Sequence, residues 1–295
     1  MPAVKKLVYI FSVVLACNGM LLSGCDWTSQ TASLAQDTTI SLEAREWSKK
    51  IDQYPENVDY YIERAKVLLD EKQYVKAIAD YTKASELAPD NASHLYLKGD
   101  ALFANDETTA ALTAYEQAEG VNPNDITAVF KHAQFLYFVR QFEKSEVKFG
   151  KLLNLNPQHA QGTFYLGMLH KEQGDTAIAI QSFKKTIELL GSDYNSSMQL
   201  ALLYDELGEK ENALRYFENA INIEPESDEA YYSRGLFYHK SGDDKRAMLD
   251  YQKTVNVNGA HYYAYYNAGN ILADQGKYEE AIGQFEICIR IKEDF

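Results

Sequence analysis

Side chains able to carry out catalysis are present in this sequence, but their spacing matches no catalytic or metal-binding pattern. The six histidines are scattered, and no two have the spacing that puts two metal ligands on one helix face. The sequence contains no HExxH motif, no GxSxG motif, no phosphate-binding glycine loop and no closely paired cysteines. We therefore expect no catalytic site, no metal site and no cofactor.

The first residues indicate a different chemistry. Two lysines precede an apolar stretch over residues 7–22, and the tetrapeptide Leu22-Ser23-Gly24-Cys25 ends it. A charged start, a short apolar core and small residues are typical of a secretory signal. The tetrapeptide resembles the bacterial lipobox, whose cysteine is acylated after cleavage. The resemblance implies a signal peptide over residues 1–24 and lipidation of Cys25; the alternative is an ordinary signal peptide or an uncleaved anchor.

Acylation at Cys25 would attach the protein to a lipid bilayer, because two or more acyl chains hold a protein at a membrane stably. We therefore expect a bacterial cell-envelope protein that faces the periplasm or the cell surface. The formal net charge of -14 argues against nucleic acid as a partner, since phosphate contacts need clustered lysine and arginine. Cys17 would leave with the signal, so the mature chain would form no internal disulfide, and Cys288 is expected to pack as a small residue.

The rest of the chain repeats every 34 residues, with three constant positions. A small residue stands at Ala65, Gly99, Ala133, Gly167, Ala201, Gly235 and Gly269. A second small residue follows twelve positions later, at Ala77, Ala111, Ser145, Ala179, Ala213, Ala247 and Ala281. An aromatic residue comes four positions after that, at Tyr81, Tyr115, Phe149, Phe183, Phe217, Tyr251 and Phe285. Such a fixed period is typical of a repeat array.

This pattern resembles the tetratricopeptide repeat, a helix-turn-helix unit of the same length. The resemblance implies an all-α, right-handed α-solenoid of seven repeats. The expected repeats are residues 58–91, 92–125, 126–159, 160–193, 194–227, 228–261 and 262–295. The small residues should let the two helices of a repeat approach closely, with the aromatic filling the space beside them. One hairpin cannot bury its apolar face alone, so the repeats must stack.

Two segments precede the repeats. Residues 25–40 are rich in Ser, Thr, Gln and Ala, which predicts a flexible tether after Cys25. Residues 41–57 predict a helix that begins at a Ser41 cap and covers the open face of the first repeat. Trp47 and Pro55 support this prediction, because they stand 34 residues before the equivalent Tyr81 and Pro89.

In the tetratricopeptide family the first helices line a concave groove, which implies a peptide-binding surface here. The predicted groove residues are mainly apolar and aromatic: Ile62, Tyr96, Phe103, Phe130, Tyr137, Phe164, Met168, Met198, Leu202, Tyr232, Leu236, Tyr266 and Asn270. The alternative for each one is packing against a neighbouring helix. Extended apolar surfaces usually mark interaction sites, and aromatic anchors bury much area at little entropic cost.

Family members that grip a C-terminal carboxylate carry lysine where this chain has Ile62, Tyr96 and Phe130. The expected partners are therefore proteins or peptides with apolar or aromatic segments. The sequence predicts a non-catalytic, membrane-anchored adaptor or scaffold. The alternatives are a structural subunit that self-associates through its ends, for example as a weak homodimer through the C-terminal repeat, and a regulatory subunit of an envelope hydrolase.

Overall fold

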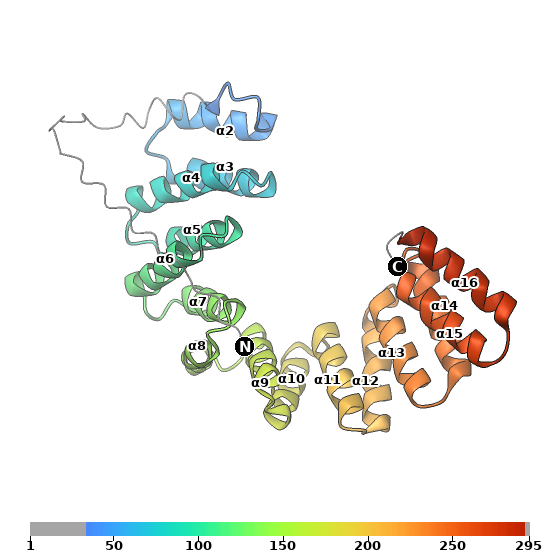
Figure 1. The fold of residues 1–295 in the computed structure, drawn as a ribbon. Helices are drawn as coiled ribbons and strands as arrows, with labels where there is room; N and C mark the ends of the chain where they lie inside the picture. Colours follow the sequence, from blue (N-terminus) through green and yellow to red (C-terminus); the bar gives the residue numbers. More distant parts are fainter. Residues whose placement is uncertain (1–33, 293–295) are drawn as a thin grey trace, which may run out of the picture. The chain divides into compact units, whose positions relative to one another are not determined.

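The computed structural model describes residues 34–292, which form 15 α-helices and no strands. This helical-repeat solenoid confirms the predicted fold class; the predicted signal peptide and Cys25 lie outside the described residues. The helices are α2 Leu42–Gln53, α3 Val58–Asp70, α4 Tyr74–Leu87, α5 Ala92–Ala104, α6 Thr108–Val121, α7 Ile126–Phe138, α8 Phe142–Leu155, α9 Ala160–Gln173, α10 Thr176–Leu190, α11 Tyr194–Glu206, α12 Lys210–Ile223, α13 Asp228–Lys240, α14 Asp244–Val257, α15 Tyr262–Asp274 and α16 Tyr278–Ile291 (Figure 1).

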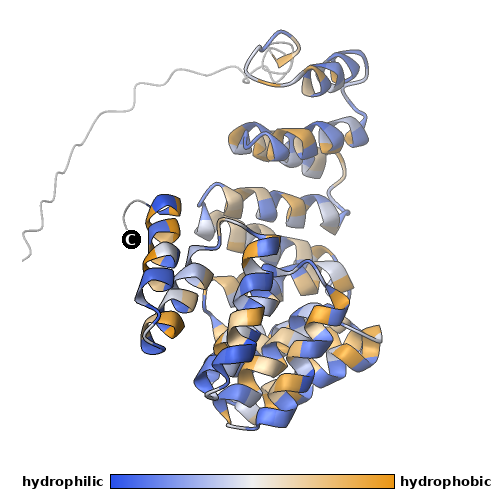
Figure 2. Ribbon diagram, turned by 90° about the vertical axis from the view of Figure 1, so that its right-hand side faces the viewer, coloured by the Kyte–Doolittle hydropathy of each residue, from blue (hydrophilic) through white to orange (hydrophobic). Residues whose placement is uncertain are grey.

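The helices after α2 pair into seven hairpins, from α3 with α4 to α15 with α16. The chain divides after Ala88 into two compact units. The N-terminal unit contains α2 and repeat 1, and the C-terminal unit contains repeats 2–7. Within the C-terminal unit the second helix of each repeat packs on the first helix of the next. Hydrophobic and hydrophilic residues alternate around the helices of each unit (Figure 2), as stacked amphipathic helices require.

The small and aromatic positions of the repeat meet inside each hairpin. A Cβ atom added to Gly167 would lie 2.9 Å from a ring carbon of Phe183. The equivalent distance for Gly235 is 2.7 Å to the ring of Tyr251. Both aromatic rings are buried. The ring therefore occupies the space that a side chain at the glycine position would need. Because glycine has no side chain, the two helices can approach closely.

The turn inside every hairpin has one residue in the left-handed conformation. Repeats 4–7 place glycine there, with φ between 74° and 86°, at Gly174, Gly208, Gly242 and Gly276. Repeats 1–3 place Lys72, Asp106 and Arg140 at the same position, with φ of 58°, 62° and 59°. The left-handed residue ends the first helix and lets the second helix return alongside it.

Helix α2 packs on repeat 1 through a buried polar contact. Ser41 caps α2 by accepting a hydrogen bond from the Ala44 backbone N–H. Arg64 in α3 forms a bidentate ion pair with Asp80 in α4, with N···O distances of 2.8 and 2.6 Å. The remaining guanidinium nitrogen of Arg64 donates to Ser48 Oγ of α2 at 2.9 Å. These three helices are thereby joined in one hydrogen-bonded network.

The end of the predicted tether is structured, so the prediction of a flexible segment up to residue 40 is wrong for its last residues. Asp37 Oδ2 lies 2.7 Å from Lys76 Nζ of α4, and the same ammonium donates to Thr39 Oγ1 at 2.8 Å. Ile40 is buried, and the Ser41 N–H donates to the Glu71 carboxylate. We call residues 37–41 the strap. Composition did not reveal it because the segment is polar apart from one isoleucine.

The contact between glycine and aromatic ring can be tested with a matched pair of substitutions. Gly167→Ala should lower the free energy of unfolding by about 1–3 kcal/mol, because the new methyl group overlaps Phe183 and Ser182. Gly150→Ala, within α8, should raise it by up to about 1 kcal/mol, because nothing lies within 4 Å of its added Cβ. Urea unfolding followed by circular dichroism measures both values. Equal effects of the two substitutions would contradict the packing argument.

Candidate partner-binding surface

The first helices of repeats 2–7 (α5, α7, α9, α11, α13 and α15) carry the predicted groove residues of the C-terminal unit, and we call their surface the first-helix face. Most of the predicted residues are half-buried there, with part of each side chain accessible: Tyr96, Phe103, Tyr137, Phe164, Met168, Leu202, Tyr232 and Asn270. Leu236 and Tyr266 are 39% and 38% exposed. Ile62 lies in the N-terminal unit, where it is half-buried against Ile51 and Tyr61.

Two predicted groove residues belong to the core instead. Phe130 is 8% exposed, and its ring centroid lies 5.0 Å from His159 and 5.9 Å from Tyr165. Met198 is 4% exposed within the core of repeats 4–7. A neighbouring helix covers each side chain, so neither is a surface anchor and the prediction is corrected for both.

Aromatic rings cluster where repeats 2, 3 and 4 meet. Phe103 of α5 stacks on Phe138 of α7 with 6.3 Å between centroids, and Phe138 packs edge-on against Tyr165 of α9 at 6.0 Å. Tyr137 contacts the same Tyr165 ring at 5.6 Å. Phe138 is 49% exposed although its neighbours are largely covered. It is the most exposed ring of this cluster, and it is not among the predicted groove residues.

A second aromatic group covers the first-helix face of repeats 6 and 7. The Tyr232 ring lies 4.5 Å from His261, and its hydroxyl accepts a hydrogen bond from Asn267 Nδ2 at 3.1 Å. This bond joins α13 to α15. Leu236 lies one helical turn after Tyr232, and Tyr266 packs on Phe285 of α16 with 5.9 Å between centroids. Aliphatic, aromatic and amide groups therefore alternate across this part of the face.

Ion pairs and hydrogen bonds join successive first helices along the same face. Lys131 Nζ of α7 lies 2.8 Å from Asp100 Oδ2 of α5. Lys240 Nζ of α13 lies 3.1 Å from both carboxylate oxygens of Asp205 in α11. Lys171 of α9 donates to Gln199 of α11 at 2.6 Å. Each bond satisfies a charged group within the protein, so much of the charge on the face is already paired.

The spacing of these partners along the chain is a signal that sequence reasoning could have found. Asp100 and Lys131 are 31 residues apart, and Asp205 and Lys240 are 35 apart. Residues about one repeat apart on first helices come side by side when the repeats stack. Oppositely charged residues at this spacing could therefore have been predicted to pair.

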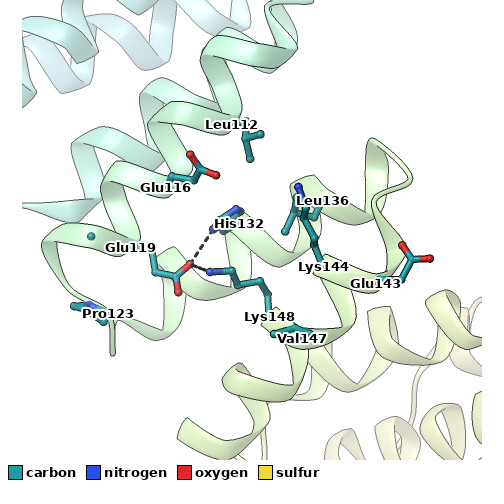
Figure 3. Close-up of a pocket in the computed structure, with 11 residues that line it drawn as sticks. Leu112, Glu116, Glu119, Pro123, His132, Leu136, Glu143, Lys144, Val147 and Lys148 are labelled. Carbon is teal, nitrogen blue, oxygen red and sulfur yellow. Dashed lines mark hydrogen bonds and ion pairs between the residues drawn. The ribbon is translucent and has the colours of Figure 1, made fainter.

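A cavity, which we call the large cavity, lies beside the second helices of repeats 2 and 3. It has a volume of about 680 Å³ and is bordered by α6, α7 and α8 (Figure 3). Its lining is largely apolar, with Leu112, Leu136 and Val147 as the main side chains. A smaller cavity of about 460 Å³ lies beside Phe164 and contains Gln161 and Asn195.

A buried carboxylate at the bottom of the large cavity connects three helices. Glu119 of α6 accepts a hydrogen bond from Lys148 of α8 at 2.6 Å and lies 2.8 Å from His132 Nδ1 of α7 (Figure 3). It also accepts one from Lys151 of α8 at 2.7 Å. Burial raises the pKa of Glu119, but these three partners outweigh it and hold the pKa at about 2. Burial also lowers the pKa of His132. The network is therefore a charged Glu119 between two ammonium groups.

Within residues 34–292, no three His, Cys, Asp or Glu side chains are grouped so that they could hold a metal ion. None of the described helices combines the length and the hydropathy needed to cross a bilayer.

Comparison with protein-family models identifies the repeats. Models described as tetratricopeptide repeat match residues 62–126 and 163–189. A model described as anaphase-promoting complex, cyclosome, subunit 3, matches residues 206–288. These matches confirm that the chain contains tetratricopeptide repeats, as the sequence pattern predicts.

Curated relatives match only in part. The chain is 25% identical over 188 residues to the mitochondrial import receptor subunit TOM70 of Homo sapiens, covering 60% of this chain and 29% of the relative. It is 31% identical over 105 residues to the protein SGT1 homolog of Bos taurus, covering 35% of this chain and 30% of that protein. The chain thus spans less than a third of either relative.

Solved structures share the fold. A tetratricopeptide repeat protein from Parabacteroides merdae has a TM-score of 0.60 and 23% identity, over 80% of this chain and 93% of that one. PilF of Pseudomonas aeruginosa has a TM-score of 0.60 and 17% identity, over 68% of this chain and 92% of that one. Both matches show a shared fold.

The Glu119 network predicts a pH dependence of stability. The pKa of Glu119 falls from 4.5 to about 2 on folding, so its contribution is complete above pH 4.5 and is lost as the pH falls toward 2. Glu119→Gln should destabilise the protein by about 1.5–3 kcal/mol at pH 6, and by less at pH 3. Urea unfolding at both pH values measures the difference. Glu116→Gln, on the exposed side of α6, is the control, and an equal pH dependence in both variants would refute the prediction.

Proposed function

We propose that this protein is a non-catalytic adaptor that binds apolar or aromatic segments of partner proteins on its first-helix face. We further propose that Cys25 anchors it to a membrane of a bacterial cell envelope. The tetratricopeptide fold supports the first part, and the order of residues in the N-terminal segment supports the second.

One observation carries the proposed partner chemistry. Along the first-helix face, Asp100 is paired with Lys131 and Asp205 with Lys240, whereas Phe138 and Leu236 remain 49% and 39% exposed. Charged groups that are already paired offer a partner little new attraction. Exposed rings and aliphatic chains gain free energy when a partner removes them from water. The face therefore favours an apolar segment over a charged one.

Exposure of these two side chains suggests a direct test of binding. The double substitution Phe138→Ser and Leu236→Ser should weaken partner binding about tenfold or more, because apolar anchors dominate interface energies. Envelope proteins captured by the wild-type chain after in vivo crosslinking are identified by mass spectrometry, and their affinity for both chains is then measured. Leu249→Ser is the control, because this exposed leucine lies on α14, a second helix. Unchanged affinity in the double variant would exclude the first-helix face as the binding surface.

The proposed anchor is tested with the two cysteines of the mature chain. Cys25→Ser should abolish incorporation of radiolabelled palmitate in a bacterial host and leave the protein unprocessed or unattached to membranes. Cys288→Ser should have no effect on labelling, because this thiol is buried in α16. Labelling of the Cys25 variant at the wild-type level would disprove lipidation at this residue.

A further inference from the structure

The strap shows how this protein binds an acidic segment on a second helix. Lys76 is the third residue of α4, and its ammonium group donates to Asp37 Oδ2 at 2.7 Å and to Thr39 Oγ1 at 2.8 Å. Three residues after Asp37, the Ile40 side chain is buried. Repeat 1 thus holds a segment in which an acidic residue precedes an aliphatic one, with a lysine at the start of the second helix as its counter-ion.

Repeat 3 has a lysine at the position equivalent to Lys76, but this lysine has no partner in the described residues. Lys144 is the third residue of α8 and stands two 34-residue repeats after Lys76. It is exposed, and among residues 34–292 no hydrogen bond or ion pair involves it. In Figure 3 its side chain extends along Leu136 at the edge of the large cavity.

The cavity beside Lys144 offers apolar side chains next to the ammonium group. Leu112 of α6 and Val147 of α8 border the cavity, with the buried Leu136 of α7 beneath them. Val147 is 71% exposed, so most of its side chain is available to a bound segment. The cavity of about 680 Å³ can accommodate one or two side chains of a bound segment.

We propose that this cavity binds a partner segment in which an acidic residue lies about three positions before an aliphatic one. The carboxylate pairs with Lys144, and the aliphatic side chain covers Val147 and Leu112. Lys148 is already paired with Glu119 at 2.6 Å, whereas Lys144 has no carboxylate partner among residues 34–292. This site is separate from the first-helix face and does not depend on the function proposed for that face.

Two nearby acids set the selectivity of the site. Glu143 precedes Lys144 in α8, and Glu116 borders the cavity from α6. Figure 3 shows the Glu143 carboxylate directed away from the Lys144 ammonium. Repeat 1 has Val75 at the position of Glu143. Replacing Glu143 by valine would therefore make repeat 3 resemble the occupied repeat and should strengthen binding of the segment.

Repeat 6 contains a related cavity that provides a comparison. Arg246, the third residue of α14, lines a cavity of about 560 Å³ together with Leu249. Its guanidinium already pairs with Asp243 at 2.7 Å. The cation of repeat 6 thus has its counter-ion within the chain, whereas the cation of repeat 3 does not, which favours repeat 3 as the binding site.

The strap itself supplies the probe for the experiment. A peptide of residues 34–41, acetylated and amidated at its ends, is titrated into the isotope-labelled full chain and followed by NMR. Saturable changes of chemical shift should be confined to residues of α6, α7 and α8. Lys144→Met, or Asp37→Asn in the peptide, should weaken binding about two- to fivefold, as expected for an exposed ion pair. Val147→Asp should abolish detectable binding, and Glu143→Val should strengthen it.

The controls distinguish binding at this cavity from binding elsewhere on the chain. Lys185→Met removes an exposed lysine from α10 and should leave the affinity unchanged. Shift changes only around Lys76 would mean that the peptide merely replaces the strap in repeat 1, and would overturn the proposal. Equal affinity of the wild type and of the Val147 and Lys144 variants would overturn it as well. Because Val147 and Lys144 are exposed, their substitution leaves the fold intact, which circular dichroism checks.

Discussion

The close contact between a small residue and an aromatic ring is the interaction on which each hairpin depends. Gly167 against Phe183 and Gly235 against Tyr251 set how near the two helices lie. This separation fixes the position of the second helix relative to the first. The first helix of the next repeat packs on that second helix, so its contacts depend on the same separation. The contact recurs at one period, so the same geometry is generated seven times from different surrounding residues.

The repeated architecture could be predicted from the sequence, because it rests on residue types that steric exclusion restricts. Gly167 and its equivalents are all glycine or alanine, because the aromatic ring of the second helix leaves no room for a larger side chain, so the signal persists through every repeat. The burial of Phe130 and Met198 could not be predicted in this way. Both occupy positions that face solvent or a neighbour depending on the shape of the next repeat, and Phe130 is covered by His159 and Tyr165.

Two polar contacts, that of the strap and that of Glu119, could not be predicted from the repeat period. The strap contributes a single buried isoleucine, and its attachment depends on Asp37 meeting Lys76 39 residues later. The Glu119 network is also specific to one repeat. Within the described residues, no other repeat has a carboxylate bonded to two lysines and a histidine. Such contacts occur once each and leave no repeating pattern. These polar contacts make individual repeats different, although all seven share the same helical hairpin.

The left-handed turn residues divide the array into two sets of repeats, 1–3 and 4–7. Lys72, Asp106 and Arg140 adopt a conformation that disfavours a side chain by about 1 kcal/mol or more, whereas glycine in repeats 4–7 adopts it freely. In an array where each repeat contacts only its neighbours, such differences are not averaged over the whole molecule. The turns of repeats 1–3 therefore carry a conformational cost that the turns of repeats 4–7 lack, and opening any of the first three turns releases that cost.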